Sequence, residues 1–380
     1  MRKILYISGT RADYGLMRQT MFCIKKHQKL DIEIAVTGMH LMPEFGMTIN
    51  EIKKDNFKIH KVNAVYEKDN KESMANFIGE CTQLLTERIK KIRPHIILLL
   101  GDRAEMLAGA IVGAYLSIPV AHIHGGDVSS TVDEIARHSI TKLAHIHFVA
   151  TKKSAERIIK MGEEPWRVFT VGAPGLDEIL NSKLYSKKEI AKIYSIDLTK
   201  PILLVVQHPV SEQVNESELL IRETLEAIKE LSYQIIVIYP NADAGGREMI
   251  KIIEEYRKYP FIQIHKSVPR RDYLSLMSIV SVMIGNSSSG IIEAPSFHLP
   301  VVNIGIRQEG RERADNIIDV THKKAQIVKA VKKAIGDKNF KIKVKRCRNP
   351  YGDGKAGIRI ANILNKIKND KKLLQKRLTY

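Results

Sequence analysis

The chain has 380 residues, of which 44% are hydrophobic, and a net charge of +19 from 61 Lys and Arg residues against 42 Asp and Glu residues. This length exceeds the size at which one hydrophobic core keeps growing, so we expect two domains. The three cysteines lie far apart without metal-ligand spacing, which argues against disulfides and a zinc site. The apolar run at 4–7 is too short for a signal peptide or a membrane span, so we expect a cytoplasmic protein.

Apolar segments of strand length alternate with amphipathic helical segments along the first half of the chain. Helices are expected at 14–26 and 74–92, and the second ends at Arg93-Pro94 because proline cannot continue a helix. The strands of a first parallel sheet are predicted at 3–7, 31–36, 95–100, 120–124, 145–149 and 168–171. This alternation is typical of a doubly wound α/β domain.

The second half of the chain repeats this architecture. Its predicted strands are 202–207, 234–239, 262–265, 282–284 and 301–304. We place the boundary between the two domains after residue 175, in the loop and helix that follow Gly172-Ala173-Pro174. Two domains that face each other form a cleft at their junction, which is a preferred place for ligand sites.

Most of the positive charge lies at the end of the chain. From Thr321 onward there are 19 Lys and Arg residues and only 3 Asp, which leaves 42 basic and 39 acidic residues in the first 320. A basic tail can bind nucleic acid or an acidic membrane. Here its charges flank apolar positions at helical spacing, without an aromatic platform or a nucleic-acid motif, and this favours solvated helix faces.

Ionisable residues gather where the predicted strands of the first sheet end. Gly101, Asp102 and Arg103 follow one strand, His122 to Asp127 end the next, and Asp133, Glu134, Arg137 and His138 come directly after. Ligands of open parallel sheets bind beyond the carboxyl ends of the strands. This arrangement therefore predicts an active site at that edge.

Two further strand-to-helix turns are candidates for anion binding. The first, 8–15, contains Arg11 and feeds a helix amino terminus, but it lacks the three-glycine spacing of a dinucleotide site, and the chain has no P-loop pattern. The second contains Ser287, Ser288 and Glu293, with Arg307 after the next strand. Its hydroxyls and amides suit a diphosphate and Glu293 suits a ribose, although serines in such a turn also simply cap a helix.

Taken in chain order, these segments resemble the hydrolysing UDP-N-acetylglucosamine 2-epimerases of sialic and legionaminic acid biosynthesis. The resemblance covers nearly the whole chain and is therefore specific. It rests on Arg11-Ala12-Asp13-Tyr14, Gly38 to Leu41, Gly101-Asp102-Arg103, His122 to Asp127, Asp133 to His145, Gln207-His208-Pro209, Gly285 to Ser288, Arg307-Gln308, Gly310 to Glu312 and Tyr351 to Gly354.

The resemblance implies a glycosyltransferase-B-like fold, with two Rossmann-like, doubly wound domains at 1–175 and 176–355 and the nucleotide sugar in the inter-domain cleft. Residues 356–380 would form a helix that returns to the first domain. In this family, loss of the proton at carbon 2 and of UDP from carbon 1 gives a 2-acetamidoglucal, to which water adds with inversion at carbon 2. The products are N-acetylmannosamine and UDP.

Site residues follow from the matching motifs. The implied catalytic residues are Asp102, His124, Asp133, Glu134 and, from the second domain, His208. Position 124 departs from the related enzymes, which carry Glu there. The implied substrate and UDP ligands are Arg11, His40, Arg103, Asn241, Ser287, Ser288, Glu293 and Arg307. The chemistry requires no metal and no cofactor, and which group takes the proton from carbon 2 stays open.

The main prediction is thus hydrolytic epimerisation of UDP-N-acetylglucosamine, with a UDP-sugar and UDP as partners, neither nucleic acid nor membrane, and assembly as a homodimer or homotetramer. One alternative substrate is UDP-2,4-diacetamido-2,4,6-trideoxyglucose, on the route to legionaminic acid. A non-hydrolysing epimerase and a glycosyltransferase of the same fold are further alternatives, and a basic nucleic-acid-binding protein is an alternative from another class.

Overall fold

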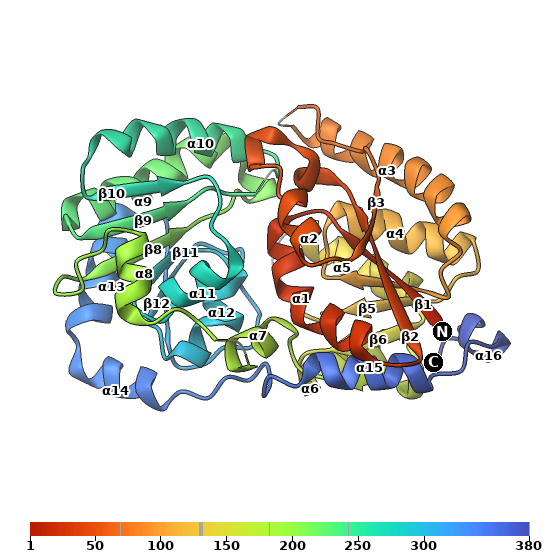
Figure 1. Cartoon of the computed structure of the whole chain (residues 1–380). Coiled ribbons are helices and arrows are strands. Elements are labelled where there is room, and N and C mark those ends of the chain that lie inside the picture. Colours follow the sequence, from red (N-terminus) through yellow and green to blue (C-terminus); the bar gives the residue numbers. More distant parts are fainter. Residues whose placement is uncertain (69, 129–131, 182, 242, 380) are drawn as a thin grey trace.

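Two parallel β-sheets lie side by side in the computed structural model, which describes residues 1–379 except 69, 129–131, 182 and 242 (Figure 1). The first sheet has the strand order β3-β2-β1-β4-β5-β6-β7. Its strands are β1 (Arg2–Ser8), β2 (Leu30–Val36), β3 (Lys58–Lys61), β4 (Ile96–Leu100), β5 (Val120–Ile123), β6 (Ile146–Val149) and β7 (Val168–Thr170). The order reverses direction after β1, as in a doubly wound domain.

Helices cover both faces of the first sheet. They are α1 (Arg11–Lys26), α2 (Ile49–Lys54), α3 (Lys71–Ile92), α4 (Ala104–Tyr115), α5 (Val132–Leu143) and α6 (Lys152–Lys160). Apolar side chains of α1 and of α15 (Ala356–Lys366) pack against one face, whereas those of α3, α4 and α5 pack against the other. Strands buried on both faces read as continuous apolar runs, as in Ile96–Leu100.

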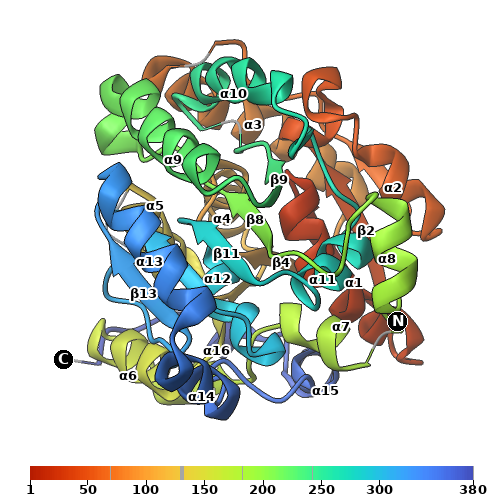
Figure 2. The ribbon, with the colours of Figure 1, turned by 90° about the vertical axis from the view of Figure 1, so that its left-hand side faces the viewer.

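The second sheet has the order β10-β9-β8-β11-β12-β13 and is also wholly parallel. Its strands are β8 (Ile202–Val206), β9 (Gln234–Ile238), β10 (Ile262–His265), β11 (Val282–Gly285), β12 (Val301–Ile304) and β13 (Ile317–Val320). The helices in this part of the chain are α7 (Gly175–Asn181), α8 (Lys187–Ile193), α9 (Ser217–Leu231), α10 (Gly246–Glu255), α11 (Arg270–Met277), α12 (Ser288–Ile292), α13 (Lys324–Gly336) and α14 (Lys338–Arg346). Helices α9, α10 and α13 share one core, and Figure 2 shows α9 and α13 side by side.

The end of the chain lies against the first domain. Helix α15 packs along α1, and Figure 1 shows it beneath that domain. The guanidinium of Arg167, which is fully buried, donates to the carbonyl oxygens of Lys372, Leu373 and Gln375 at 2.9, 2.6 and 2.9 Å, and so holds α16 (Lys371–Leu374) in place. The predicted domain boundary after residue 175 falls between the two sheets, at the start of α7, and stays a prediction.

The prediction of two doubly wound parallel sheets is confirmed. The predicted strands correspond to β1, β2 and β4 to β12, with ends that differ by at most one residue. The edge strands β3 and β13 were not predicted. They read Lys-Ile-His-Lys and Ile-Ile-Asp-Val and are only partly buried, because an edge strand has a partner on one side alone. None of the helices described is long and apolar enough to cross a membrane.

Candidate active site

The carboxyl ends of β4 and β5 bring Asp102 and His124 to the same edge of the first sheet. Leu100 pairs with Ile123 across these strands, and the Gly101 amide donates to the Ile123 carbonyl oxygen at 2.9 Å. Gly101 has a φ of +77°, which lets the chain turn sharply before Asp102. The sequence therefore delivers an acid and an imidazole from neighbouring strand ends, as predicted from the motifs.

Arg137 connects Asp102 with the loop after β5. Its guanidinium forms an ion pair with the Asp102 carboxylate and donates to the Asp127 carbonyl oxygen at 3.0 Å. Burial, and after it the charges of Arg311 and Arg307, hold the pKa of Arg137 well below its usual range. This effect shows that arginines of the second domain lie near the strand ends of the first.

His124 is almost fully buried and lies beside Asp127. Its Nδ1 is 3.1 Å from the Asp127 carboxylate, and its backbone has a φ of +62°, in the left-handed region. His is among the residues that tolerate this region best. The backbone amide of His124 donates to the Phe148 carbonyl oxygen of β6 at 3.1 Å, so the turn is fixed to the sheet.

Asp133 and Glu134 lie in the first turn of α5. Asp133 meets Arg307 of the second domain, with 3.4 Å between its carboxylate and the guanidinium. Glu134 lies 3.4 Å from Nε2 of His138, one helical turn later. Asp133 thus lies at the junction of the two domains, where residues 174 positions apart meet.

His208 follows β8 in the second domain. Its Nδ1 accepts the backbone N–H of Asn241 at 3.1 Å, so a neutral ring carries its proton on Nε2. Its own backbone amide donates to the Asn286 side chain at 2.7 Å. Burial, and after it the charges of Arg307 and Arg103, hold the pKa of His208 well below its usual range. The ring is therefore a neutral hydrogen-bond donor at pH 7 in the empty site.

Arg103 joins the first domain to the second. One end of its guanidinium is 3.4 Å from Asp243, and Nε is 3.3 Å from the carboxylate of Glu105, which is fully buried. Burial lowers the pKa of Arg103, but Glu105, Tyr66 and Asp243 together outweigh burial and hold that pKa well above its usual range. A side chain at Gly9 or Gly38 would collide with the Glu105 carboxylate, so both glycines make room for it.

Sequence reasoning missed Glu105 and Asp243. Both lie close to predicted ligands, Glu105 two residues after Arg103 and Asp243 two residues after Asn241, whose amide donates to it at 2.5 Å. The signal was therefore present in the sequence. A charge next to a predicted anion ligand is a candidate for holding that ligand in position.

The second strand-to-helix turn follows β11. The Ser287 hydroxyl caps α12 by accepting the Ser289 amide, and Ser288 begins the helix. Since α12 has only five residues, hydroxyls and the nearby Arg307 contribute more to anion binding here than a helix dipole does. Arg307 donates to the Asn286 carbonyl oxygen at 3.4 Å, at the start of the same turn.

Two more of the predicted ligands, Glu293 and Arg11, form ion pairs with protein groups. Glu293 forms a buried ion pair with Arg270. Arg11 forms an ion pair with Glu51 and donates to Ser267 of the second domain, and burial lowers its pKa to about 10, so that it stays charged. The ribose role of Glu293 and the anion role of Arg11 stay predictions.

His40 is fully buried in the 3₁₀ turn Gly38–Leu41. Its Nε2 is 2.9 Å from the Ser8 hydroxyl and its Nδ1 is 2.7 Å from the Thr48 hydroxyl, so both ring nitrogens have protein partners. Burial lowers the pKa of His40 to about 3. These contacts give His40 a structural role in the empty site, and its contact with the sugar stays a prediction.

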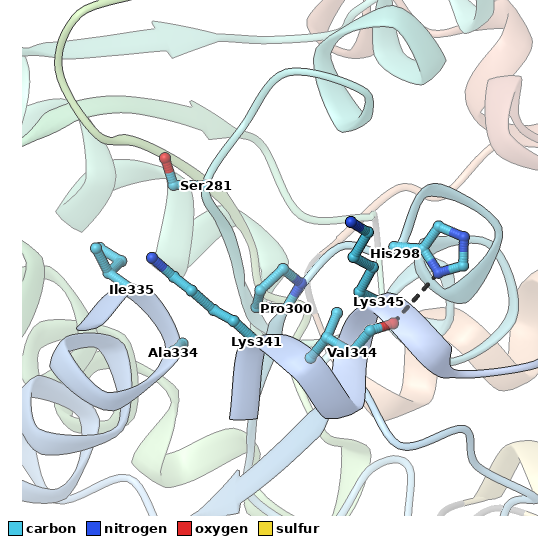
Figure 3. A pocket seen from close by; sticks show the side chains of 8 residues that line it. All are labelled: Ser281, His298, Pro300, Ala334, Ile335, Lys341, Val344 and Lys345. Carbon is cyan, nitrogen blue, oxygen red and sulfur yellow. Dashed lines mark hydrogen bonds between the residues drawn. The ribbon is translucent and has the colours of Figure 1, made fainter. Parts of the chain in front are cut away.

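The junction does not coincide with the hollow drawn in Figure 3. That hollow has Ser281 and Pro300 on its wall, which precede β11 and β12, together with Lys341 and Lys345 of α14. It therefore lies at the amino ends of the second sheet, away from the strand ends that carry the predicted residues. Within the described ranges, no group of three or more His, Cys, Asp or Glu side chains is arranged to hold a metal ion.

Comparison with known proteins agrees with this arrangement. The model of the UDP-N-acetylglucosamine 2-epimerase family matches residues 23–365. This chain belongs to that family. One relative, the hydrolysing UDP-N,N'-diacetylbacillosamine 2-epimerase of Legionella pneumophila, is 43% identical over 377 residues and covers 99% of both chains. A second, the hydrolysing GDP/UDP-N,N'-diacetylbacillosamine 2-epimerase of Campylobacter jejuni, is 36% identical over 323 residues and covers 84% of both.

The fold of the family is shared as well. The crystal structure of UDP-GlcNAc 2-epimerase from Neisseria meningitidis bound to UDP-GlcNAc superposes with a TM-score of 0.81 at 20% identity, over 96% of this chain and all of that one. The predicted glycosyltransferase-B-like fold, with two parallel-sheet α/β domains, is thereby confirmed. The chain is a UDP-sugar epimerase by family, and its substrate is addressed below.

Proposed function

We propose that this enzyme hydrolyses UDP-2,4-diacetamido-2,4,6-trideoxyglucose, also called UDP-N,N'-diacetylbacillosamine, with inversion at carbon 2. The products are UDP and free 2,4-diacetamido-2,4,6-trideoxymannose. Both relatives quoted above carry this substrate in their names and describe the reaction as hydrolytic. They favour this substrate over UDP-N-acetylglucosamine, which was the main prediction from the sequence.

One observation carries the catalytic part of the proposal: cations and proton-transfer groups from both domains meet at one junction. Arg103 and Arg307 both influence the pKa of His208, and Arg307 also lies 3.4 Å from Asp133. Such a cluster of positive charge suits the diphosphate of a nucleotide sugar, and carboxylates and imidazoles beside it suit proton transfer at the sugar. A basic patch for nucleic acid would not need these acids.

The reaction needs two proton transfers and stabilisation of a leaving group. A base removes the proton from carbon 2, the bond between carbon 1 and the UDP oxygen breaks, and a double bond forms between carbons 1 and 2. Water then adds: its oxygen bonds to carbon 1, its released proton passes to a carboxylate of the site or to solvent, and an acid delivers a proton to the opposite face of carbon 2. Arg103, Arg307 and the Nε2–H of His208 would stabilise the departing diphosphate.

The test is to incubate the protein in deuterated water with each of the two UDP sugars. We expect UDP and a free sugar of inverted configuration that carries deuterium at carbon 2, with the diacetamido-trideoxy sugar turned over faster. Faster turnover of UDP-N-acetylglucosamine would overturn the substrate assignment. Intact epimerised UDP-sugar would overturn hydrolysis, and no release of UDP from either compound would overturn the proposal as a whole.

A further inference from the structure

The loop after β5 contains a pair of side chains whose arrangement resembles the orienting half of a catalytic triad. We propose that Asp127 is a positioning residue that fixes His124 in one tautomer, so that Nε2 of His124 is the base that takes the proton from carbon 2. This inference rests on the proposed function, because it assigns a group to the first step of that reaction. It is carried by the hydrogen bonds of the loop itself.

The contact between the two side chains sets the tautomer. Nδ1 of His124 lies 3.1 Å from Oδ2 of Asp127. An ionised carboxylate only accepts hydrogen bonds, so Nδ1 is the donor, and a neutral ring then has its lone pair on Nε2. Among the residues that the structure describes, none forms a hydrogen bond with Nε2, which leaves this atom available to a substrate.

Asp127 is itself held by a second element. Its other carboxylate oxygen accepts the Ser154 hydroxyl of α6 at 2.7 Å, and its side chain is only 4% exposed. Gly126 has a φ of +74°, and a side chain at this position would collide with the Ser154 carbonyl group. The loop therefore fits closely against α6, and the carboxylate cannot turn away from His124 without losing its bond to Ser154.

Asp127 remains ionised in this environment. Burial raises its pKa, but the hydrogen bond and charge of His124, the charge of Arg311 and the bond from Ser154 outweigh burial, so the pKa lies below its ordinary value. A fixed carboxylate of this kind stabilises the imidazolium that forms when the ring accepts a proton.

Three arginines lie around the pair: Arg137 of α5, Arg157 of α6 and Arg311 after β12. His122 of β5 and Tyr351 lie nearby, and two carboxylates partly balance the arginines, Asp102 beside Arg137 and Glu312 beside Thr151. The arginines oppose a positive charge on His124. Asp127 is the anion in direct contact with the ring and offsets them.

The other predicted catalytic groups are worse placed for this step. The carboxylate of Asp102 is bound by Arg137 and that of Asp133 faces Arg307, so both are already engaged by guanidinium groups. His208 carries its proton on Nε2 and suits donation to the diphosphate. Glu134 is about a third exposed and lies beside His138. Of the five predicted catalytic residues, His124 alone combines two features: a proton-accepting Nε2 available to substrate, and a buried carboxylate, that of Asp127, in contact with Nδ1.

The main test compares Asp127→Asn with the wild-type enzyme. An amide keeps the shape of the side chain but no longer enforces the Nδ1–H tautomer, and we expect kcat to fall by about 10²- to 10⁴-fold. KM and the Kd for UDP should change by less than threefold, because the Asp127 carboxylate is engaged by His124 and Ser154 and, in this proposal, acts only through His124. Glu33→Gln is the matched control. It also replaces a buried carboxylate by an amide, and Glu33, on β2, lies 2.6 Å from His60. It should leave kcat unchanged.

Two further measurements keep the proposal testable if Asp127→Asn does not fold. Ser154→Ala removes one hydrogen bond from the carboxylate and should lower kcat by roughly 2- to 10-fold. In the wild-type protein with ¹⁵N-labelled histidine, assigned with His124→Gln, the spectrum should show a protonated Nδ1 and an unprotonated Nε2.

The outcomes separate the two proposals. An Nε2–H tautomer for His124, or an unchanged kcat in a folded Asp127→Asn variant, would overturn the inference even if the wild type hydrolyses the UDP sugar. A wild type that releases no UDP would overturn the proposed function. The predicted tautomer together with the selective loss of kcat supports the inference.

Discussion

Arg307 offers the sharpest test of the predicted diphosphate site. It comes from the second domain, its side chain is 14% exposed, and it approaches Asp133 and the Asn286 carbonyl oxygen, both at 3.4 Å. If it binds the diphosphate, Arg307→Ala removes a charged hydrogen bond that contributes about 1.5–3 kcal/mol. UDP must first displace the partly exposed Asp133, an ion pair worth about 0.5 kcal/mol. The net loss is about 1–2.5 kcal/mol, or a roughly 5- to 70-fold weaker Kd for UDP.

The assay is calorimetric titration of the folded protein with UDP at pH 7.5 and two salt concentrations. Arg307→Lys should fall between wild type and Arg307→Ala, because a lysine keeps the charge but not the planar fork. The control is Arg222→Ala on α9, where the guanidinium pairs only with surface carboxylates of Glu218 and Glu255. A change of less than threefold in Arg307→Ala, or an equal change in the control, would refute the placement of the diphosphate beside Arg307.

Three further predictions follow from the buried charges. Burial, Arg307 and Arg103 lower the pKa of His208. The negative charge of a bound diphosphate should raise that pKa, and UDP binding should therefore be coupled to proton uptake below pH 7. Calorimetry in buffers of different ionisation enthalpy should show this uptake, and His208→Gln should abolish it. Burial lowers the pKa of His40 and of His122 to about 3 in the folded protein, against about 6.5 in the unfolded chain. Below about pH 6.5 the unfolded chain therefore binds protons that the folded protein does not, and the fold loses stability. Below that pH, each histidine should lower the free energy of unfolding by up to about 1.4 kcal/mol per pH unit. In urea unfolding at pH 6.5 and 5.5, His122→Gln should therefore lose less free energy of unfolding between the two pH values than the wild type does. An equal loss in both proteins would contradict this. Arg167→Ala removes buried hydrogen bonds to three carbonyl oxygens and should lower the free energy of unfolding by at least about 2 kcal/mol. It should also speed proteolysis of α16 but leave kcat unchanged, because these bonds lie far from the junction. An α16 that stays protected from proteolysis would contradict the role of Arg167 in holding it.

The centre of each sheet and one of its two edges, β7 or β10, could be predicted from the sequence, whereas the opposite edge strands β3 and β13 could not. Strands such as β4 and β8 are buried on both faces, so they appear as uninterrupted apolar runs. β3 has a single strongly apolar residue, Ile59, and its ends are exposed. Its position is set by hydrogen bonds to β2, a property of the folded sheet that its own residues do not signal.

The same division applies to the site. That Asp102 and His124 lie at one edge follows from the order of the strands, and the motifs specify their neighbours. The pairing of Arg307 with Asp133 could not be predicted, because it depends on how two separately folded domains face each other. Nor does sequence reveal that Arg103 is held between Glu105 and Asp243, since Glu105 is adjacent in the chain but Asp243 is 140 residues away.

These pairs across the junction determine the charge distribution of the site. The total charge of +19 contributes little to it, because that charge lies mainly in the carboxyl-terminal helices, whereas the site depends on a few arginines whose partners are carboxylates. Arg307 neutralises Asp133 and Arg103 faces Asp243 until an anion competes for the guanidinium groups. A diphosphate that binds both arginines would weaken both of these ion pairs. Asp133, a candidate proton donor for the second face of the sugar, would then lose its pairing with Arg307 only once the substrate is in place.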